Sequence, residues 1–201
     1  MARTWVFACV FALAIVPAAQ AASLSKSYSY FTIRGKTLDE IQEQLDRRGP
    51  RLRETGRRHA GATRMEFKTH AGYRERNGRC EVTSGKVTLV ARVILPRWSQ
   101  RGASEDVRLV WETLAADIKR HEEAHVTIAR KYAREIEAQI AAVRPQRSCA
   151  LARKKVEETT DRLMRRHNAE QDRFDEVEAH NFESRLTRLL DQRMRRAAYG
   201  R

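Results

Sequence analysis

The sequence lacks cysteine motifs, internal repeats and long apolar runs. It contains only three cysteines, none in a C-x-x-C spacing, and it shows no internal repeat and no nucleic-acid-binding motif. Its longest apolar run, from Trp5 to Val16, covers about 12 residues, which is too short for a helix that spans a bilayer. These absences argue against a thiolate metal module, a nucleic-acid-binding protein and an integral membrane protein.

The first 21 residues have the pattern of a signal peptide. Arg3 gives a positive start, the apolar run follows, and Ala19-Gln20-Ala21 is a small-x-small cleavage site. We expect cleavage near Ala21 and a periplasmic or secreted protein. The rest of the chain, about 180 residues, is long enough for one domain with a hydrophobic core.

Cysteine usage agrees with export. Cys9 lies in the signal segment, so only Cys80 and Cys149 remain after cleavage. Two cysteines in an oxidising compartment are expected to form a disulfide. The bond would close a loop of about 70 residues, which is worth on the order of 4 kcal/mol in the chain-entropy model.

The chain is strongly basic. Its formal net charge is +14, and because Arg3 is the only charged residue of the signal segment, the mature part carries +13. Acidic residues interrupt the basic ones along most of the chain, a pattern typical of solvated helix faces with i,i+4 ion pairs. The alternative is affinity for an anionic lipid or an acidic cell-wall polymer. No nucleic acid is expected as a partner, since an exported protein seldom meets one.

The first half of the mature chain is predicted to form a sheet and one helix. Thr37-Leu38-Asp39-Glu40 is a capping box, which predicts a helix that continues to about Arg48. Strands are predicted at residues 28–33, 62–73, 80–82 and 86–95, with Ser84-Gly85 between the last two. Short connections favour an antiparallel sheet. Apolar residues on both faces of 86–95 predict a strand that is buried on both sides.

The second half is predicted to form two long helices, so the fold class is α+β. Ser104 is a candidate N-cap of the first helix and Pro145 ends it. Its inward stripe steps by three or four residues through Trp111, Leu114, Ile118, His121, His125, Ile128, Tyr132 and Ile136. The second helix runs from about Leu151 towards Met194, with a break expected near Asn181. Its stripe is Val156, Leu163, His167, Phe174 and Val177.

The first long helix carries an H-E-x-x-H motif, His121-Glu122-Glu123-Ala124-His125. Residues four apart lie one turn apart on a helix, so His121 and His125 can bind the same zinc ion. Glu122 is rotated by about 100° around the helix axis. From there it can act as the general base and take a proton from a water that zinc has activated. The alternative is a pair of hydrogen-bonded core histidines without a metal.

A third ligand has to come from elsewhere in the chain. One zinc-peptidase pattern has a third histidine six residues after the second, but Lys131 occupies that position. In another pattern the third ligand comes from a later helix. The second long helix offers the stretch 174–181, which contains acidic residues and His180. Antiparallel packing of the two helices would bring this stretch to the metal.

Together these features resemble the DUF922 family, bacterial proteins predicted to be secreted zinc-dependent proteases. The resemblance spans most of the mature chain and rests on Pro96-x-Trp98, Trp111, the H-E-x-x-H motif, Cys80, Cys149 and a late element. The family's late element reads roughly Tyr-Asp-x-x-Thr-x-His-Gly. Asp175 and His180 match it, whereas Phe174, Glu178 (or Val177) and Asn181 replace its Tyr, Thr and Gly.

The resemblance implies a zincin-like metallopeptidase domain over residues 22–181. His180 is then the preferred third zinc ligand, beside His121 and His125. Asp175 and Glu178 are each expected either to orient a metal ligand or to replace His180 as the third ligand.

The sequence therefore predicts a secreted zinc metallopeptidase that hydrolyses a peptide or protein substrate in the cell envelope. The substrate would lie extended along an edge strand, with 62–73 and 86–95 as candidates. The alternative function is a non-catalytic, zinc-stabilised envelope binding protein in which four protein ligands close the metal shell. Residues 182–201 are predicted to form a basic amphipathic helical tail, which either packs on its own domain, forms a dimer, or contacts a partner or an anionic envelope surface.

Overall fold

The computed structural model of the chain describes residues 22–51 and 56–199, so the predicted signal peptide lies outside the described residues. The elements follow in the order β1 (Ser23–Ile33), α1 (Leu38–Arg48), β2 (Ala62–Arg76), β3 (Arg79–Trp98), α2 (Glu105–Ala141) and α3 (Cys149–Tyr199). A three-stranded sheet and three helices confirm the α+β class. None of the helices in the described ranges has the length and apolarity that a bilayer crossing needs.

The strand order in the sheet is β1-β3-β2. β2 and β3 form an antiparallel hairpin whose two-residue turn, Asn77-Gly78, has φ values of 52° and 68°. Positive φ at both positions is what a type I′ hairpin turn requires. β1 pairs parallel to β3, so the prediction of a purely antiparallel sheet was wrong. The physical reason is that α1 and β2 intervene between β1 and β3, which leaves enough chain for a crossover.

β3 is one continuous strand, although the sequence predicted two short strands separated by Ser84-Gly85. Gly85 is not a turn residue here. A Cβ atom built on it would lie 2.5 Å from Cγ2 of Ile140 in α2. The glycine therefore allows a helix to approach the strand closely, which is a common reason for glycine within a strand.

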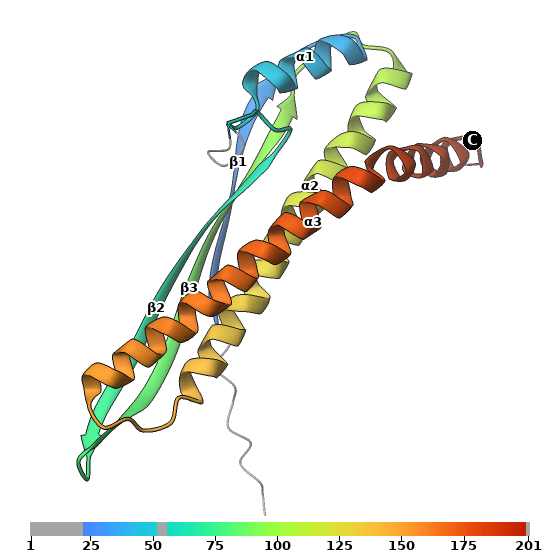
Figure 1. Cartoon of the computed structure of the whole chain (residues 1–201). Helices are drawn as coiled ribbons and strands as arrows, with labels where there is room; N and C mark the ends of the chain where they lie inside the picture. The colour runs from blue at the N-terminus through green and yellow to red at the C-terminus, as the bar shows by residue number, and fades with distance from the viewer. Residues whose placement is uncertain (1–21, 52–55, 200–201) are drawn as a thin grey trace, which may run out of the picture.

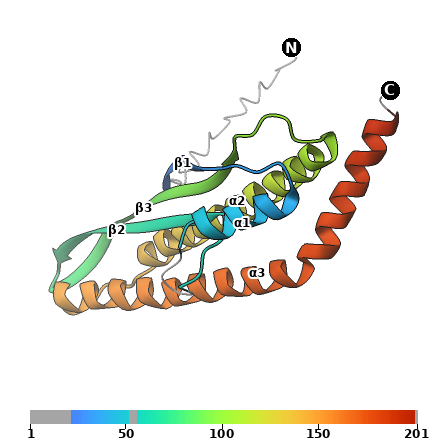
Figure 2. The ribbon, with the colours of Figure 1, turned by 90° about the horizontal axis from the view of Figure 1, so that it is seen from above.

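In the part of the chain that the structure describes, helices cover one face of the sheet and leave the other without a helical layer (Figure 1 and Figure 2). Val87 and Leu89 of β3 are buried in one cluster with apolar residues of α2 and α3. On the other face of the same strand Val90 and Ile94 are half-buried and Arg92 is exposed. The prediction that this strand is buried on both sides was therefore wrong, because no described element packs over its second face.

α2 and α3 lie side by side and run antiparallel (Figure 1). Their contacts show the direction, since successive partners lie later in α2 and earlier in α3. Asp117 contacts Arg185, His125 contacts Gln171, and Glu135 contacts Arg166. The predicted antiparallel pairing of the two long helices is thus present, and it places residues 171–178 opposite the H-E-x-x-H motif.

α3 is a single helix and has no break at Asn181, contrary to the sequence prediction. Its axis changes direction in its C-terminal part, as Figure 2 shows. Residues 182–199 continue this helix, and two of them contact α2: Arg185 binds Asp117 and Arg193 contacts Glu112. Phe182 and Met194 keep 41% and 49% of their surface exposed. The tail therefore packs partly on its own domain.

The predicted disulfide is present: Cys80 and Cys149 are joined, with their Cα atoms 5.0 Å apart. Cys80 is fully buried at the start of β3, and Cys149 begins α3. The bond therefore connects the sheet to the turn between the two long helices, as expected from the sequence.

We expect Cys80→Ala/Cys149→Ala to lower the free energy of unfolding by about 4 kcal/mol, since 69 residues separate the two cysteines. Urea denaturation of both proteins, with and without reductant, measures the change. Reductant should shift the midpoint of the wild type and leave the double variant unaffected. Equal midpoints for the oxidised wild type and the variant would contradict the expected stabilisation.

Candidate functional site

The H-E-x-x-H residues lie in the middle of α2, and both histidine side chains point towards α3. The Nε2 atoms of His121 and His125 are 3.1 Å apart. His125 is nearly buried, whereas the His121 side chain keeps 27% of its surface exposed. The two rings therefore meet at one point that remains accessible from solvent.

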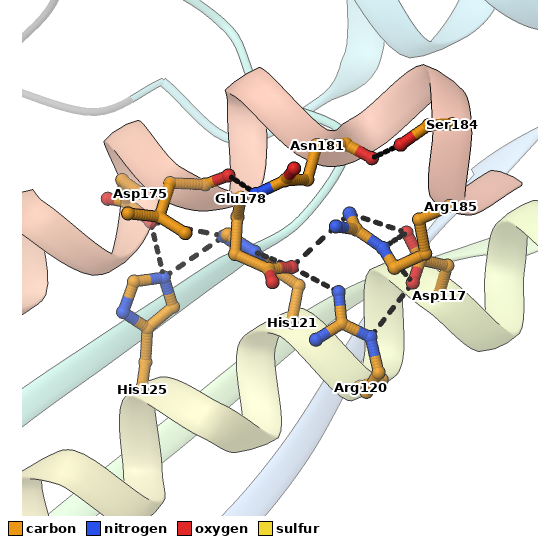
Figure 3. Close-up of polar contacts among 10 residues, drawn as sticks. Asp117, Arg120, His121, His125, Asp175, Glu178, Asn181, Ser184 and Arg185 are labelled. Atoms are coloured by element: carbon orange, nitrogen blue, oxygen red, sulfur yellow. Dashed lines mark hydrogen bonds and ion pairs between the residues drawn. The ribbon is translucent and has the colours of Figure 1, made fainter.

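Asp175 of α3 completes this group, as Figure 3 shows. Its Oδ1 atom is 3.2 Å from Nε2 of His121 and 3.0 Å from Nε2 of His125. In a tetrahedral zinc site with bonds of 2.0–2.1 Å, ligand atoms are about 3.3 Å apart. The triangle of two nitrogens and one oxygen thus has nearly the size that such an ion requires. Among the described residues, this is the group of His, Cys, Asp and Glu side chains that could hold a metal ion.

His125 is oriented from behind by an amide. Its Nδ1 atom is 2.6 Å from Oε1 of Gln171, and Nε2 of Gln171 donates to the backbone oxygen of His125. The same amide nitrogen lies 2.9 Å from Nε2 of His167, whose Nδ1 is 2.9 Å from the side-chain oxygen of Asn168. These bonds are all satisfied when Nδ1 of His125 carries a proton and Nε2 is free to bind a metal.

Burial and hydrogen bonding shift the pKa values of Asp175 and His125 in opposite directions. For Asp175, burial acts to raise the pKa, but hydrogen bonds with His121 and His125 outweigh it and hold the pKa well below its usual range. For His125, burial acts to lower the pKa, but its bonds with Asp175 and Gln171 outweigh this effect and raise it. The group is therefore a strongly interacting set of one carboxylate and two imidazoles.

Glu122 lies on another side of α2, against the start of β2. Thr63 Oγ1 is 2.7 Å from Oε2 of Glu122, and the glutamate is only 5% exposed. A Cβ atom on Gly61 would lie 2.7 Å from the other carboxylate oxygen and 2.9 Å from Cγ2 of Ile118, so a larger residue at this position would displace the Glu122 side chain. Burial raises the pKa of the Glu122 carboxyl, although the Thr63 bond and the two nearby histidines oppose the shift.

A shallow groove runs beside the histidines between α2 and α3. It has a volume of about 480 Å³ and is lined mainly by apolar side chains, including Ala124, Ile128, Phe174 and Val177. Phe174 also contacts both site rings: it stacks on His121 with the ring centres 5.0 Å apart and meets His125 edge-on. Val177, predicted on the inward stripe of α3, is instead 50% exposed at this groove.

The structure does not bring His180 to the other two histidines. His180 is exposed, and it is not part of the group formed by His121, His125 and Asp175. Five residues separate it from Asp175, which corresponds to a rotation of about 140° around a helix. His180 therefore lies on a different side of α3 from the residue that faces α2.

Sequence reasoning missed the orienting role of Gln171. The amide lies four residues before Asp175, so both residues are on one helix face, and this spacing was visible in the sequence. Its signal was weak because a single glutamine on a helix is ordinarily a solvent-exposed residue. Here it is 8% exposed and satisfies its hydrogen bonds through His125 and His167.

The match to a family model covers residues 28–181, and the model is described as "Bacterial protein of unknown function (DUF922)". This chain belongs to the DUF922 family. The match confirms the resemblance seen in the sequence, and it runs from β1 to the part of α3 that faces the histidines. Residues 182–199 of this DUF922 protein lie beyond it. No curated protein and no solved structure matches the chain.

Proposed function

We propose that this protein is a secreted, zinc-dependent metallopeptidase with a zincin-like site. The observation that carries the proposal is the convergence of His121, His125 and Asp175 at one point, with ligand atoms 3.0–3.2 Å apart. Two imidazoles and a carboxylate suit zinc, and three protein ligands leave the fourth position that a catalytic site needs. Asp175 takes the place that was predicted for His180.

The orienting bonds support a metal site more than a pair of core histidines. Each histidine presents Nε2 to the shared point and turns Nδ1 towards an oxygen atom of α3, from Gln171 or from Glu178. The second nitrogen of a metal-binding histidine almost always makes a hydrogen bond, as in His125, and Nδ1 of His121 faces Glu178 at 3.5 Å. A structural pair of histidines would not need both Nε2 atoms beside one carboxylate oxygen.

Glu122 is proposed as the general base. Bound zinc would polarise the scissile carbonyl and lower the pKa of water at the site. The Glu122 carboxylate would take a proton from a water molecule at the site while the oxygen of that water attacks the carbonyl carbon. It then gives the proton to the departing amine nitrogen as the C–N bond breaks, so that one water is consumed for each peptide bond cleaved. Thr63 and Gly61 fix the position of the carboxylate for both steps.

β2 is the proposed substrate-binding edge. The other predicted candidate for this role, residues 86–95, lies in β3. That prediction was wrong, because β3 is the central strand and is paired on both sides. β2 is at the edge, and its residue Thr63 contacts the proposed base. An extended peptide that adds to this edge would therefore be led to the histidines.

Removal of the metal tests the proposal against the alternative of a non-catalytic, zinc-stabilised envelope protein. We expect the purified mature protein to bind one zinc ion per chain and to cleave members of a broad peptide library. A chelator should abolish cleavage and added zinc should restore it. A zinc-containing protein that loses thermal stability with the chelator, but never cleaves a peptide, would support the alternative. A protein without stoichiometric metal would refute both.

A further inference from the structure

Behind His121 lies a network of four charged side chains that bridges α2 and α3 (Figure 3). Asp117 and Arg120 come from α2, and Glu178 and Arg185 come from α3. Arg185 binds both oxygens of Asp117, at 3.0 and 3.1 Å, and Arg120 binds Oδ1 of Asp117 at 2.8 Å. Two acids and two arginines balance one another, so the network holds no uncompensated charge.

Glu178 is the member of this network that reaches the site. Arg120 donates to Oε2 of Glu178, and Nη2 of Arg185 lies 3.2 Å from the same oxygen. This oxygen is also 3.5 Å from Nδ1 of His121, the ring nitrogen opposite the one that faces Asp175. Glu178 thus faces Nδ1 of His121 and not the point where His121, His125 and Asp175 converge. It is therefore not placed to be a metal ligand.

We propose that Glu178, clamped by Arg120 and Arg185, is a positioning residue that holds His121 with its Nε2 atom directed at Asp175 and His125. This inference rests on the proposed metal site and extends it to residues that do not touch the metal. The contacts with the arginines are important because an unpaired glutamate side chain can adopt many rotamers. The two guanidinium groups hold the Glu178 side chain in a single rotamer. Phe174 stacks on the His121 ring, so the ring is held at one face and at one edge.

The arrangement differs for the two histidines. His125 is oriented by the neutral amide of Gln171, whereas His121 faces a carboxylate that belongs to a charge network. His125 is also more buried, with 11% of its side chain exposed against 27% for His121. His121, the more exposed histidine, is in contact with less of the surrounding protein. It is also the histidine that faces a charged residue, Glu178.

The test compares Glu178→Ala and Glu178→Gln with Glu135→Ala as a matched control. Glu135 forms an ion pair with Arg166 between the same two helices, but it does not contact the site. We expect Glu178→Ala to weaken zinc affinity by about 10- to 100-fold. Glu178→Gln keeps an oxygen acceptor and should lose less. Glu135→Ala should bind zinc as the wild type does. Competition with a chromophoric chelator measures the three affinities.

A second measurement does not depend on the metal. In crystal structures of the metal-free proteins, the His121 ring should turn away from Asp175 in Glu178→Ala and keep its place in Glu135→Ala. Equal zinc affinities for the two alanine variants, with an unmoved ring, would overturn the positioning role and leave the proposed peptidase untouched. A moved ring in a protein whose wild type binds no zinc would support positioning and refute the proposed function.

Discussion

Glu122→Gln is expected to retain zinc and to lower kcat for peptide hydrolysis by about 10³-fold, in the range that general base catalysis contributes. Glutamine has nearly the same shape and can still accept a hydrogen bond from Thr63, so the fold should not change. It cannot, however, take a proton from water. Metal analysis and steady-state kinetics on one cleaved peptide, with the wild type in parallel, measure the two effects.

The neighbouring residue provides the control for this substitution. Glu123 lies on the same helix but faces the other way, towards Lys26 and Tyr28 of β1. Glu123→Gln should therefore keep kcat within a few-fold of the wild type. If Glu122→Gln cleaved peptides as fast as Glu123→Gln, Glu122 would not be the base. A loss of zinc in Glu122→Gln would mean that the carboxylate acts on metal binding instead.

The largest effect on metal binding is expected from Asp175→Ala. Removal of orienting groups around a metal typically weakens affinity by 10- to 100-fold, so loss of a direct ligand should cost at least about 100-fold. His180→Ala, five residues further along α3, should bind zinc as tightly as the wild type. Isothermal titration of zinc into the metal-free proteins measures both affinities.

This pair of variants decides between two orientations of α3. In the structure Asp175 faces the histidines and His180 does not. If His180→Ala lost zinc and Asp175→Ala kept it, α3 would have to be rotated by about 140° from its orientation in the structure. Such a rotation would also remove Gln171 from His125, so the hydrogen bond between them provides an independent check.

The helices were the most predictable part of the fold, because local signals define them. Thr37 and Ser104 cap α1 and α2 as the sequence indicated, and their side chains accept hydrogen bonds from Glu40 and Val107. The sheet was less predictable, because strand direction depends on contacts between distant segments. Nothing in the local sequence of β1 indicates that it pairs parallel to β3, and the short motif Ser84-Gly85 resembles a turn.

In the candidate site, too, the residues within one helix could be predicted from the sequence, and the residue from another helix could not. The H-E-x-x-H spacing within one helix placed His121, Glu122 and His125 on the appropriate sides of α2. The third member comes from α3, and its identity depends on the rotation of that helix relative to α2. A family pattern that contains both Asp175 and His180 could not separate them, because the rotation follows from packing along the whole of α3.

The three side chains of α3 that face ring nitrogens of the two histidines lie within two turns, since Gln171, Asp175 and Glu178 occupy one stripe of that helix. Upstream of this stripe, the disulfide at Cys149 and buried residues such as Val156 and Leu163 help to fix its rotation. One residue inserted between Leu163 and Gln171 would swing all three groups away together by about 100°. Seven inserted residues would return the stripe to within about 20° of its original direction. The spacing between the anchored start of α3 and this stripe is thus as much a determinant of the site as the identity of its side chains.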